Sequence, residues 1–592
     1  MTELTIDDLL LIRSPAYSYE NFNQYFLKRV LKTDFFKAGI FFASQTLFIE
    51  LRKKDFEYEL LNAQTRLTLW KYLNRMCFRA LPYGLFSSYS VSGWAEAAHG
   101  RLCFSGNHKL IAHPDFKVIF NYLKSLNAED YPTLKYYTNN SLYRSAGQFR
   151  FISQAYSSDS KPAIIELKIV PGLKKLLKFI SSGREKEVIL DFLRNEYGDD
   201  LPVLEYFQSL LEAQVIVSAL TPNVTGLNYN QRCAALLEEY PGVDHQLLKS
   251  FKYSFNDQEQ ALPELNEHID GLLEKNAENA AYSLYQRDVT GGIRNDIQDE
   301  LGKFIRAMDK LTADHDLDNM SRFKADFIQK YDQQEVPLMM VLDPGTGIGY
   351  ENLVTAFDEQ DEDFVDDVRH KEEPRRNAGW GAAEKMLFKK WNDLHRSGSD
   401  RIMITAADIE KLPESNHLLP PGLYVLFKSI DDELWIDSAA GVSGIELSAR
   451  FAATGTPFED RLKDICAREM ATNKDYLFAE IAFSPNDRAS NVNQRGSFYD
   501  YEIPVLSHSA RPEQYVIKLD DLVISIRNNM ILLRSVRLNR YIIPRLSSAY
   551  NFRLTTIPIF RFLCDLQFQG VKSNLYFSLA ELFPGMEYYP RV

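Results

Sequence analysis

Arg75 and Arg79 are the two residues whose type and spacing best suit chemistry on a negatively charged substrate. The stretch 65–80 is rich in helix-forming residues, and Pro82 is expected to end this helix at or before Leu81. Residues four apart leave one face of a helix, so the two guanidinium groups are predicted to lie one turn apart. Such a pair fits a phosphate chain or a carboxylate, which each group can bind through two hydrogen bonds. Taken alone, the spacing favours a simpler interpretation, a solvated pair of arginines at a helix C-terminus.

Six short segments of the sequence resemble motifs of one enzyme family, in the expected order. Arg75–Phe86 resembles the pattern R-x-x-x-R-x-x-P-[FY]-G-L-F near the start of lantibiotic dehydratases, which dehydrate Ser and Thr in ribosomally made peptides. The other five segments are Arg13–Pro15, Ala43–Ser44, Leu220–Gly226, Leu342–Tyr350 and the run Leu533–Asn551. Each segment alone is weak evidence, but together they extend over nearly the whole chain.

The resemblance implies a reaction. In this family the amino-terminal domain takes glutamyl-tRNA and transfers glutamate to a Ser or Thr hydroxyl of a precursor peptide. This is an ester exchange, in which a hydroxyl attacks an activated carbonyl, an oxyanion develops and the 3′ hydroxyl of the tRNA leaves. Such a site needs cationic or N–H donors for the oxyanion and for the tRNA phosphates. We therefore expect glutamyl-tRNA as a co-substrate and no cofactor.

The family motifs assign candidate roles to five residues. Arg75 and Arg79 are the best candidates for catalysis and for binding the tRNA end, and Arg13 is a weaker one. Asp288 corresponds to a family aspartate, which we expect to bind the ammonium of glutamate or to orient an arginine. Arg450 resembles the arginine of a family G-R-F motif, with a structural ion pair as an equally good alternative.

Further basic residues could contact the body of the tRNA. They form two clusters: Arg52, Lys53 and Lys54, and Lys385, Lys389, Lys390 and Arg396. For both clusters, ordinary surface charge is the favoured interpretation. The net charge of −13 argues against a generic nucleic-acid binder, whose surface is usually basic. A local basic channel can still bind RNA in an acidic protein.

The composition predicts a large globular protein. With 592 residues, 45% of them hydrophobic, the chain is expected to form several structural units. The five cysteines form no CxxC pair and the histidines no HExxH motif, so neither a disulfide framework nor a metal site is predicted. No signal-peptide pattern and no apolar run of the roughly 18 residues that span a bilayer is present, so we expect a cytoplasmic protein.

We expect an α+β fold, a large mixed α/β protein with several subdomains and an embedded winged-helix-like module. The expected parts are 1–135 (α/β, with the arginine motif), 136–220 (winged-helix-like), 221–400 (mostly helical, with an acidic loop near 357–378) and 401–592 (α/β). In 136–220 the pattern predicts a β-hairpin, a third strand, helices over 173–180, 186–197 and 203–213, and a closing strand. The resemblance implies that this module binds the precursor's leader peptide by adding a strand to a sheet edge. A purely structural subdomain is the alternative.

Four local features complete the prediction. Phe36–Leu51, aromatic and β-branched, is predicted as a strand followed by a turn, and Tyr83–Trp94 as a strand. Seven carboxylates between Asp358 and Asp367 predict a solvated loop, with a loop facing RNA or a partner as the alternative. The glycines of 345–349 lack the spacing and the Lys-Ser/Thr of a phosphate-binding loop, so we expect a turn near the active-site wall.

The chain departs from the family pattern at its end. Full-length dehydratases continue into a second domain that eliminates glutamate, whereas this sequence stops at Tyr589–Val592, inside the connecting stretch. We therefore expect the elimination domain to be absent, with a fragment or a split system with a separate eliminase and cyclase as explanations. A third is a non-eliminating relative, such as a peptide aminoacyl-tRNA ligase that extends a peptide C-terminus. A leader-binding scaffold without catalysis also stays open, although Arg75 and Arg79 weigh against it. A homodimer is implied by resemblance only.

Overall fold

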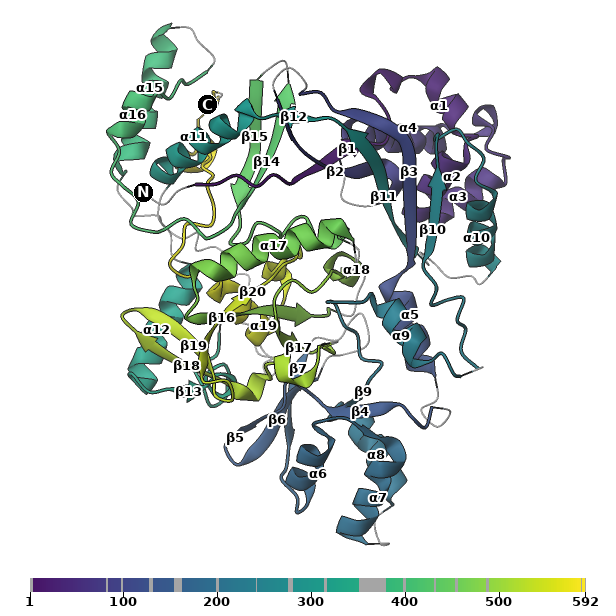
Figure 1. The fold of residues 1–592 in the computed structure, drawn as a ribbon, viewed down its shortest axis with the longest axis vertical. Helices are drawn as coiled ribbons and strands as arrows, with labels where there is room; N and C mark the ends of the chain where they lie inside the picture. The colour runs from purple at the N-terminus through teal and green to yellow at the C-terminus, as the bar shows by residue number, and fades with distance from the viewer. Residues whose placement is uncertain are drawn as a thin grey trace.

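Two six-stranded sheets and a helical tip follow one another along the long axis of the molecule in this computed structural model (Figure 1). The structure describes residues 4–592 except for 81–83, 97–99, 127–130, 154–161, 199–201, 241, 275–280, 313–316, 351–379, 398–400, 431–432, 453–455, 486–488, 510, 587 and 591. The predicted acidic loop at 358–367 lies outside the described residues. The expected large mixed α/β architecture is confirmed.

The first sheet is mixed and has the strand order β1-β2-β11-β3-β10, with β12 beside β2. Its strands are β1 (Leu10–Pro15), β2 (Ser87–Ala95), β3 (Cys103–Pro114), β10 (Phe251–Phe255), β11 (Ala281–Thr290) and β12 (Gly292–Arg294). The helices on one of its faces are α1 (Gln24–Val30), α2 (Asp34–Ala43), α3 (Gln45–Arg52), α4 (Ala63–Phe78) and α10 (Pro263–Glu274). Strand residues Leu110, Phe255 and Tyr285 join the helices in one apolar cluster. Helices therefore cover one face of this sheet. One of them, α4, carries Arg75 in its last turn and is followed by Arg79.

One sequence-based expectation about this part is wrong. Phe36–Leu51 is not a strand but most of α2 and α3. The Oγ1 atom of Thr33 accepts a hydrogen bond from the N–H of Phe36, and Ser44 caps α3 in the same way, so two N-caps divide the segment. The segment 221–400, expected to be mostly helical, also contributes β10, β11 and β12, which complete the first sheet. The strand predicted over Tyr83–Trp94 is confirmed from Ser87 onward as β2, whereas Gly84–Phe86 form a 3-10 helix.

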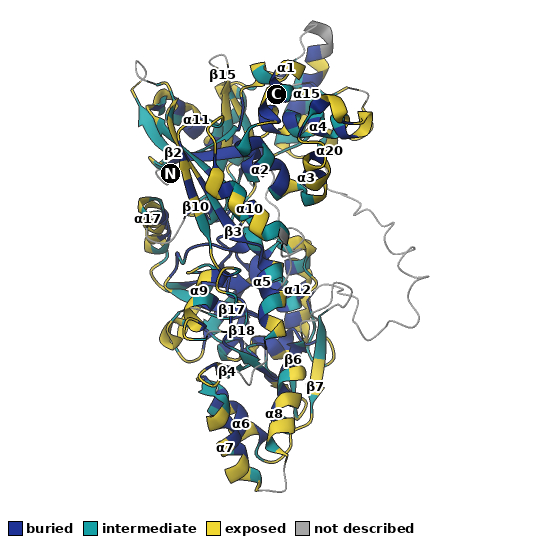
Figure 2. Cartoon of the chain, turned by 90° about the vertical axis from the view of Figure 1, so that its right-hand side faces the viewer, coloured by how far each residue is buried: buried dark blue, intermediate teal, exposed yellow. Residues whose placement is uncertain are grey.

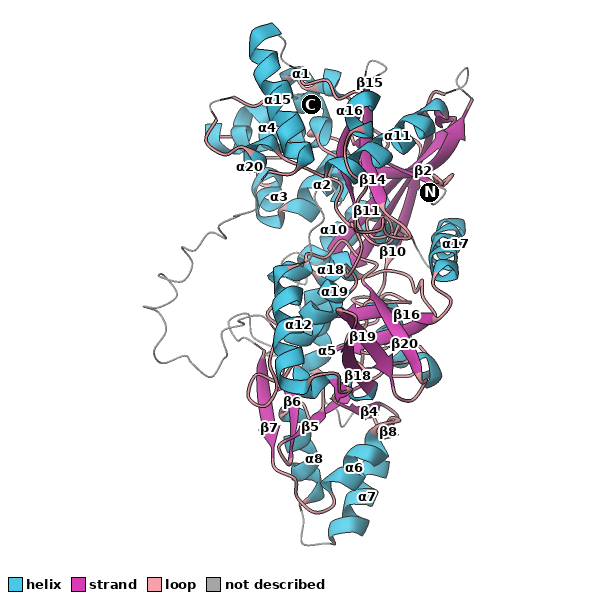
Figure 3. Cartoon of the chain, turned by 90° about the vertical axis from the view of Figure 1, so that its left-hand side faces the viewer, coloured by secondary structure: helices cyan, strands magenta, loops and turns pink. Residues whose placement is uncertain are grey.

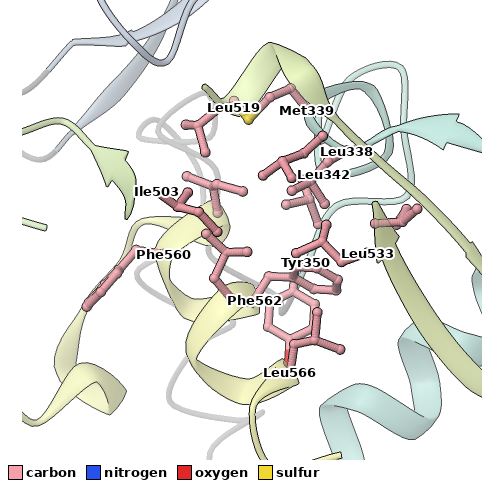
Figure 4. Close-up of a cluster of buried hydrophobic side chains, with 14 of the residues drawn as sticks. Leu338, Met339, Leu342, Tyr350, Ile503, Leu519, Leu533, Phe560, Phe562 and Leu566 are labelled. Carbon is pink, nitrogen blue, oxygen red and sulfur yellow. The ribbon is translucent and has the colours of Figure 1, made fainter. Parts of the chain in front are cut away.

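The second sheet has the order β13-β18-β19-β20-β16-β17. Its strands are β13 (Val336–Pro337), β16 (Tyr476–Phe483), β17 (Tyr501–Val505), β18 (Leu522–Arg527), β19 (Met530–Ser535) and β20 (Arg540–Arg545). Helices α12 (Asp318–Tyr331), α13 (Leu338–Val341) and α19 (Pro558–Leu566) pack against it, as Figure 3 shows for α12 and α19. Leu342, Ile503 and Phe562 belong to the buried cluster between these elements (Figure 4). Burial of this apolar surface is the main force that holds the carboxy-terminal part together.

The third part is the tip formed by residues from 135 to 218. Its strands are β4 (Lys135–Thr138), β5 (Tyr143–Ser145), β6 (Gln148–Ser153), β7 (Ala163–Leu167), β8 (Arg184–Glu185) and β9 (Ile216–Ser218). Its helices are α6 (Leu173–Ile180), α7 (Lys186–Tyr197) and α8 (Val203–Glu212), whose inner faces are buried and outer faces exposed (Figure 2). The predicted hairpin, third strand, three helices and closing strand are present, whereas β4 and β8 were not predicted. Their identity as a winged helix stays a prediction.

The remaining elements join or flank these parts. They are α5 (Phe116–Ser125), α9 (Tyr229–Leu236), α11 (Asp296–Leu311), α15 (Ala382–Ser397), α16 (Ala406–Glu410), β14 (Tyr424–Ile430), β15 (Glu433–Ala440), α17 (Pro457–Thr472), α18 (Ser490–Asn493) and α20 (Leu579–Leu582). Within the described residues, none of the helices combines the length and the apolar character needed to cross a membrane.

The glycine-rich loop at 345–349 is held by a carboxylate rather than left open for a phosphate. Oδ1 of the buried Asp343 accepts hydrogen bonds from the N–H groups of Gly345 (2.8 Å) and Thr346 (2.9 Å). Its carboxylate also accepts bonds from Tyr143 and Arg150 of the tip, each at 2.7 Å. Burial would raise the pKa of Asp343, but these hydrogen bonds outweigh it and lower the pKa. The loop is thus a structural link between the tip and the second sheet.

Candidate active site

Arg75 and Arg79 line one hollow although only Arg75 is helical. Helix α4 ends at Phe78, and Arg79 has extended backbone angles of φ −122° and ψ 120°. The expectation that both arginines leave one helical face is therefore wrong for Arg79. The hollow has a volume of about 410 Å³ and is also lined by Phe22, Trp70, Lys71 and Asn74. Arg79 thus lines the same hollow as Arg75 from the extended segment after the helix rather than from the helix itself.

Among the described residues, no carboxylate compensates the charge of this hollow. The described residues that line it include three cations and no carboxylate. Among the residues that the structure describes, no acidic side chain forms an ion pair with Lys71, Arg75 or Arg79, whereas Arg52 and Lys28 nearby in sequence are paired. The guanidinium of Arg75 lies 5.7 Å from the ring centroid of Tyr72, and both arginines are exposed. Cations arranged in this way bind anionic groups, and arginines do so with a fixed fork geometry.

Arg13 is tied to the same segment. It lies on β1, and its guanidinium donates a hydrogen bond to the carbonyl of Ala80, the residue after Arg79. Across the sheet, Arg13 pairs with Tyr89 of β2, and Tyr89 pairs with Gln286 of β11. Gln286 in turn pairs with Lys109 of β3. Directly opposed residues point to one face of a sheet, so these four side chains form a row.

Asp288 lies beside the far end of this row. Its Oδ1 atom is 3.7 Å from Nζ of Lys109, and both side chains are partly exposed. The pairing of β11 with β3 shifts its register between Arg287 and Val289, which marks a bulge at Asp288. Bulges re-aim side chains and are frequent beside active sites. Asp288 and Lys109 together offer one anionic and one cationic group on the same sheet face.

The segment that contains Arg450 contacts this row through the next residue, Phe451. It belongs to the 3-10 helix η6 (Ala449–Phe451), and the ring of Phe451 lies 4.8 Å from the ring of Tyr89. The structure thus brings Arg13, Asp288 and the Arg450 segment around one row of the first sheet. Ala80, the residue after Arg79, contacts this group through its carbonyl, which accepts a hydrogen bond from Arg13.

Glu446, four residues before Arg450, yields a prediction about pH. Its Oε1 accepts hydrogen bonds from the N–H groups of Val442 (2.8 Å) and Ser443 (3.1 Å), yet burial raises its pKa from 4.5 to about 7. Between these values the folded protein keeps a proton that the unfolded chain releases, so folding stability falls as the pH rises through this window. We expect a fall of about 2 kcal/mol, less than the full shift because part of the side chain reaches solvent.

The check is urea unfolding of the wild type and Glu446→Gln at several pH values across this window. The glutamine can accept the same backbone hydrogen bonds but does not titrate, so the variant should lose this contribution to the slope. Identical slopes in the two proteins would contradict the assignment.

The basic residues that could contact the body of the tRNA differ in whether they form ion pairs and in where they lie. Arg52 forms an ion pair with Asp270 at 2.7 Å, and Lys390 forms one with Asp408 at 2.7 Å, which with Thr405 lowers the pKa of that carboxyl. Lys53, Lys54, Lys385 and Lys389 are exposed, and the side chain of Arg396 lies outside the described part. Helix α15, which carries the second cluster, and α3, which ends at Arg52 of the first cluster, lie at opposite sides of the upper half of the molecule (Figure 1). The two clusters therefore do not form one patch.

Sequence reasoning missed several residues of this region. Trp70 and Lys71 carried a usable signal, because they lie five and four residues before Arg75 on the same predicted helix. Phe22 and Lys109 carried none, because only the tertiary fold brings them to the hollow and to Asp288.

The chain matches a known family. Residues 32–592 match the model described as lantibiotic dehydratase, N terminus. The subtilin biosynthesis protein SpaB of Bacillus subtilis is 21% identical over 576 residues, covering 91% of this chain and 53% of SpaB. The crystal structure of the tRNA-dependent lantibiotic dehydratase MibB from Microbispora sp. 107891 matches with a TM-score of 0.74 and 17% identity, covering 95% of this chain and 56% of MibB. The glutamylation domain of TbtB from thiomuracin biosynthesis matches with a TM-score of 0.58 and 16% identity, covering 92% of this chain and 69% of that one. The chain thus shares their fold and spans about half the length of SpaB and MibB.

Proposed function

We propose a function for this chain from one premise: it belongs to the lantibiotic dehydratase family and corresponds to the amino-terminal part. We propose that it transfers glutamate from glutamyl-tRNA to Ser or Thr side chains of a ribosomally made precursor peptide. The tRNA dependence of MibB and the glutamylation domain of TbtB support this reaction. The observation that carries it is the hollow that Lys71, Arg75 and Arg79 line with no carboxylate among the described residues.

The reaction exchanges one ester for another. The hydroxyl oxygen of the peptide bonds to the glutamyl carbonyl carbon, and the bond from that carbon to the terminal ribose oxygen of the tRNA breaks. The proton of the attacking hydroxyl ends on the ribose oxygen. In this proposal Arg75 and Arg79 hold the phosphates of the tRNA end and the developing oxyanion, since cations fixed in advance stabilise charge that forms in the transition state. Asp288 holds the ammonium of glutamate, which its partial exposure allows.

In this proposal the precursor peptide binds at the tip. Strand β7 is an edge of the sheet β5-β6-β7, and its Ile165 is exposed. An edge strand offers unpaired N–H and C=O groups to which an extended peptide can add a strand. Binding of the leader at β7 would hold the peptide on the enzyme while its Ser and Thr residues reach the hollow.

The test is the intact mass of the cognate precursor after incubation with this protein, glutamyl-tRNA synthetase, tRNA and glutamate. We expect glutamyl mass gains that require tRNA and that alkali removes, as it removes esters. Tandem fragmentation locates each gain. A gain at the C-terminus as an alkali-stable amide would assign the chain to peptide ligation instead, and no gain with leader binding intact would assign it to scaffolding.

A further inference from the structure

Arg287 of β11 is a partly buried cation without a counter-charge among the described residues. Its Nε atom is buried and has no hydrogen-bond partner there, and the neighbouring carboxylate of Asp288 pairs with Lys109 instead. The guanidinium lies 3.8 Å from the ring centroid of Phe104, and burial lowers the pKa of Arg287. A desolvated charge that is left unpaired is unfavourable, so such a group indicates a site for an anion.

Two further hydrogen-bond donors lie beside Arg287 on the same face of the first sheet. Strand β11 lies between β2 and β3 (Figure 1), and Arg287 pairs directly with His108 of β3. The preceding residue of β11 pairs with Tyr89 of β2, which places Ser90 next to Arg287. The hydroxyl of Ser90 is buried as well and lacks a hydrogen-bond partner in the described structure. Neighbouring residues of adjacent strands point to one face, so the three side chains form a short row.

The hydrogen bond of His108 leaves its other ring nitrogen available. Nδ1 of His108 lies within hydrogen-bonding distance of Oη of Tyr285, which accepts a hydrogen bond from Gln258 at 3.0 Å. When Tyr285 donates its proton to Nδ1, the neutral imidazole carries its own proton on Nε2, which becomes a donor. Burial and the charge of Arg287 lower the pKa of His108 and outweigh the opposite effect of two aspartates, so the neutral ring is favoured.

This row faces away from the proposed ammonium site. Consecutive residues of a strand point to opposite faces, so His108 lies on the other side of the sheet from Lys109 and its partner Asp288. His108 instead stacks on Phe255, a residue of the apolar cluster that joins the sheet to its helices. Phe104 is 40% exposed, so the row can be reached from solvent.

We propose that Arg287, His108 and Ser90 bind the carboxylate group of a small organic acid. The guanidinium supplies one positive charge and a fork of N–H donors, and the imidazole and the hydroxyl donate further hydrogen bonds. One positive charge balances one carboxylate, whereas a phosphate group carries nearly two negative charges at neutral pH and would leave one unbalanced. The inference goes beyond the proposed function, in which none of these three residues takes part.

The experiment measures how acetate changes the urea unfolding midpoint of the protein. Sodium acetate replaces sodium chloride at constant ionic strength and neutral pH, so that charge screening stays the same. A ligand that binds only the folded state stabilises it, so we expect acetate to raise the midpoint of the wild type. Arg287→Met should bind acetate about 10- to 100-fold more weakly, the loss expected for hydrogen bonds to a charged group, and its midpoint should change much less.

Two more variants separate the site from general effects of acetate on stability. Arg52→Met removes an exposed arginine that is paired with Asp270, so it should respond to acetate like the wild type. Ser90→Ala removes a buried hydroxyl without a partner among the described residues, so it should not lower the midpoint in chloride. It should nevertheless weaken acetate binding by about 2- to 10-fold, the loss of one hydrogen bond. Circular dichroism confirms that each variant is folded.

A second readout follows His108 itself by NMR titration, with its signal assigned through His108→Gln. A bound carboxylate favours the charged imidazole, so acetate should raise the pKa of His108 by about one unit. In Arg287→Met, loss of the neighbouring positive charge should raise this pKa already in chloride, and acetate should add little.

Three outcomes overturn the inference: equal responses of the wild type and Arg287→Met to acetate, a pKa of His108 that acetate leaves unchanged, or a larger effect of phosphate than of acetate on that pKa. None of these assays involves tRNA or a precursor peptide, so their result is independent of the proposed function.

Discussion

The double variant Arg75→Ala, Arg79→Ala should lose glutamate transfer by about 100- to 1000-fold while it keeps its affinity for the leader peptide. Loss of one fixed donor to a developing charge costs a factor of this size in other enzymes. Both side chains are exposed and have no carboxylate partner among the described residues, so their removal leaves no buried charge unpaired. The measurement is single-turnover mass gain of the precursor, together with leader-peptide binding by calorimetry.

The matched control is Lys28→Ala, Lys32→Ala. It removes the same formal charge from α1 and the turn that follows it, but these lysines are already paired with Glu59 and Glu57. We expect transfer within about twofold of the wild type, because exposed ion pairs contribute little. Equal losses in both double variants would mean that net charge, and not the hollow, drives the reaction. The variant Arg75→Lys, Arg79→Lys should fall between the two, since it keeps the charge but not the fork.

Local elements could be predicted where residues that begin or end helices mark their bounds in the sequence. Helices α6 and α7 have the predicted bounds because glycines follow them, and Gly198 takes a φ of 75°, which favours glycine. The mistaken strand at Phe36–Leu51 shows the opposite case, since residue types suited to strands were outweighed by two N-caps and a buried helical face. Aromatic content is a weaker signal than capping in this segment.

Only part of the candidate site could be predicted from the sequence. Arg75 and Arg79 lie in one short motif, so their association needs no knowledge of the fold. The approach of Lys109 to Asp288 depends instead on the pairing of β3 with β11, which no local pattern encodes. The same holds for Tyr89 and Phe451, whose contact joins the first sheet to the carboxy-terminal part.

Two of the family-like segments hold the fold together rather than form the hollow. In Leu220–Gly226, Thr225 donates to the buried carboxylate of Glu502, and the carbonyl of Val224 accepts from the N–H of Arg495. In the run ending at Asn551, Arg545 forms a buried ion pair with Glu469 at 2.6 Å. The first segment contacts the second sheet from a distant part of the chain, and the second segment forms strands of that sheet, so resemblance in them reports a shared fold.

Arg495 provides the sharpest test of this scaffold. Its side chain is fully buried, and Nε donates to Glu480 and to Ser547, each at 2.8 Å. Its terminal nitrogens donate to Asn493 and to the carbonyl of Ile481. Arg495→Met should therefore lower the free energy of unfolding by about 3–5 kcal/mol, because the buried carboxylate of Glu480 would lose its counter-charge.

The measurement is urea unfolding followed by circular dichroism, with Arg52→Ala as the control. Arg52 and Asp270 form an ion pair whose side chains are 52% and 51% exposed, so its loss should change stability by less than about 1 kcal/mol. Arg495→Met combined with Glu480→Gln should recover part of the loss, because the neutral glutamine needs no counter-charge yet can still accept from the N–H of Phe498. If Arg495→Met were as mild as Arg52→Ala, the buried network would not be what joins these segments. If the double variant were no more stable than the single one, lost packing rather than unpaired charge would explain the effect.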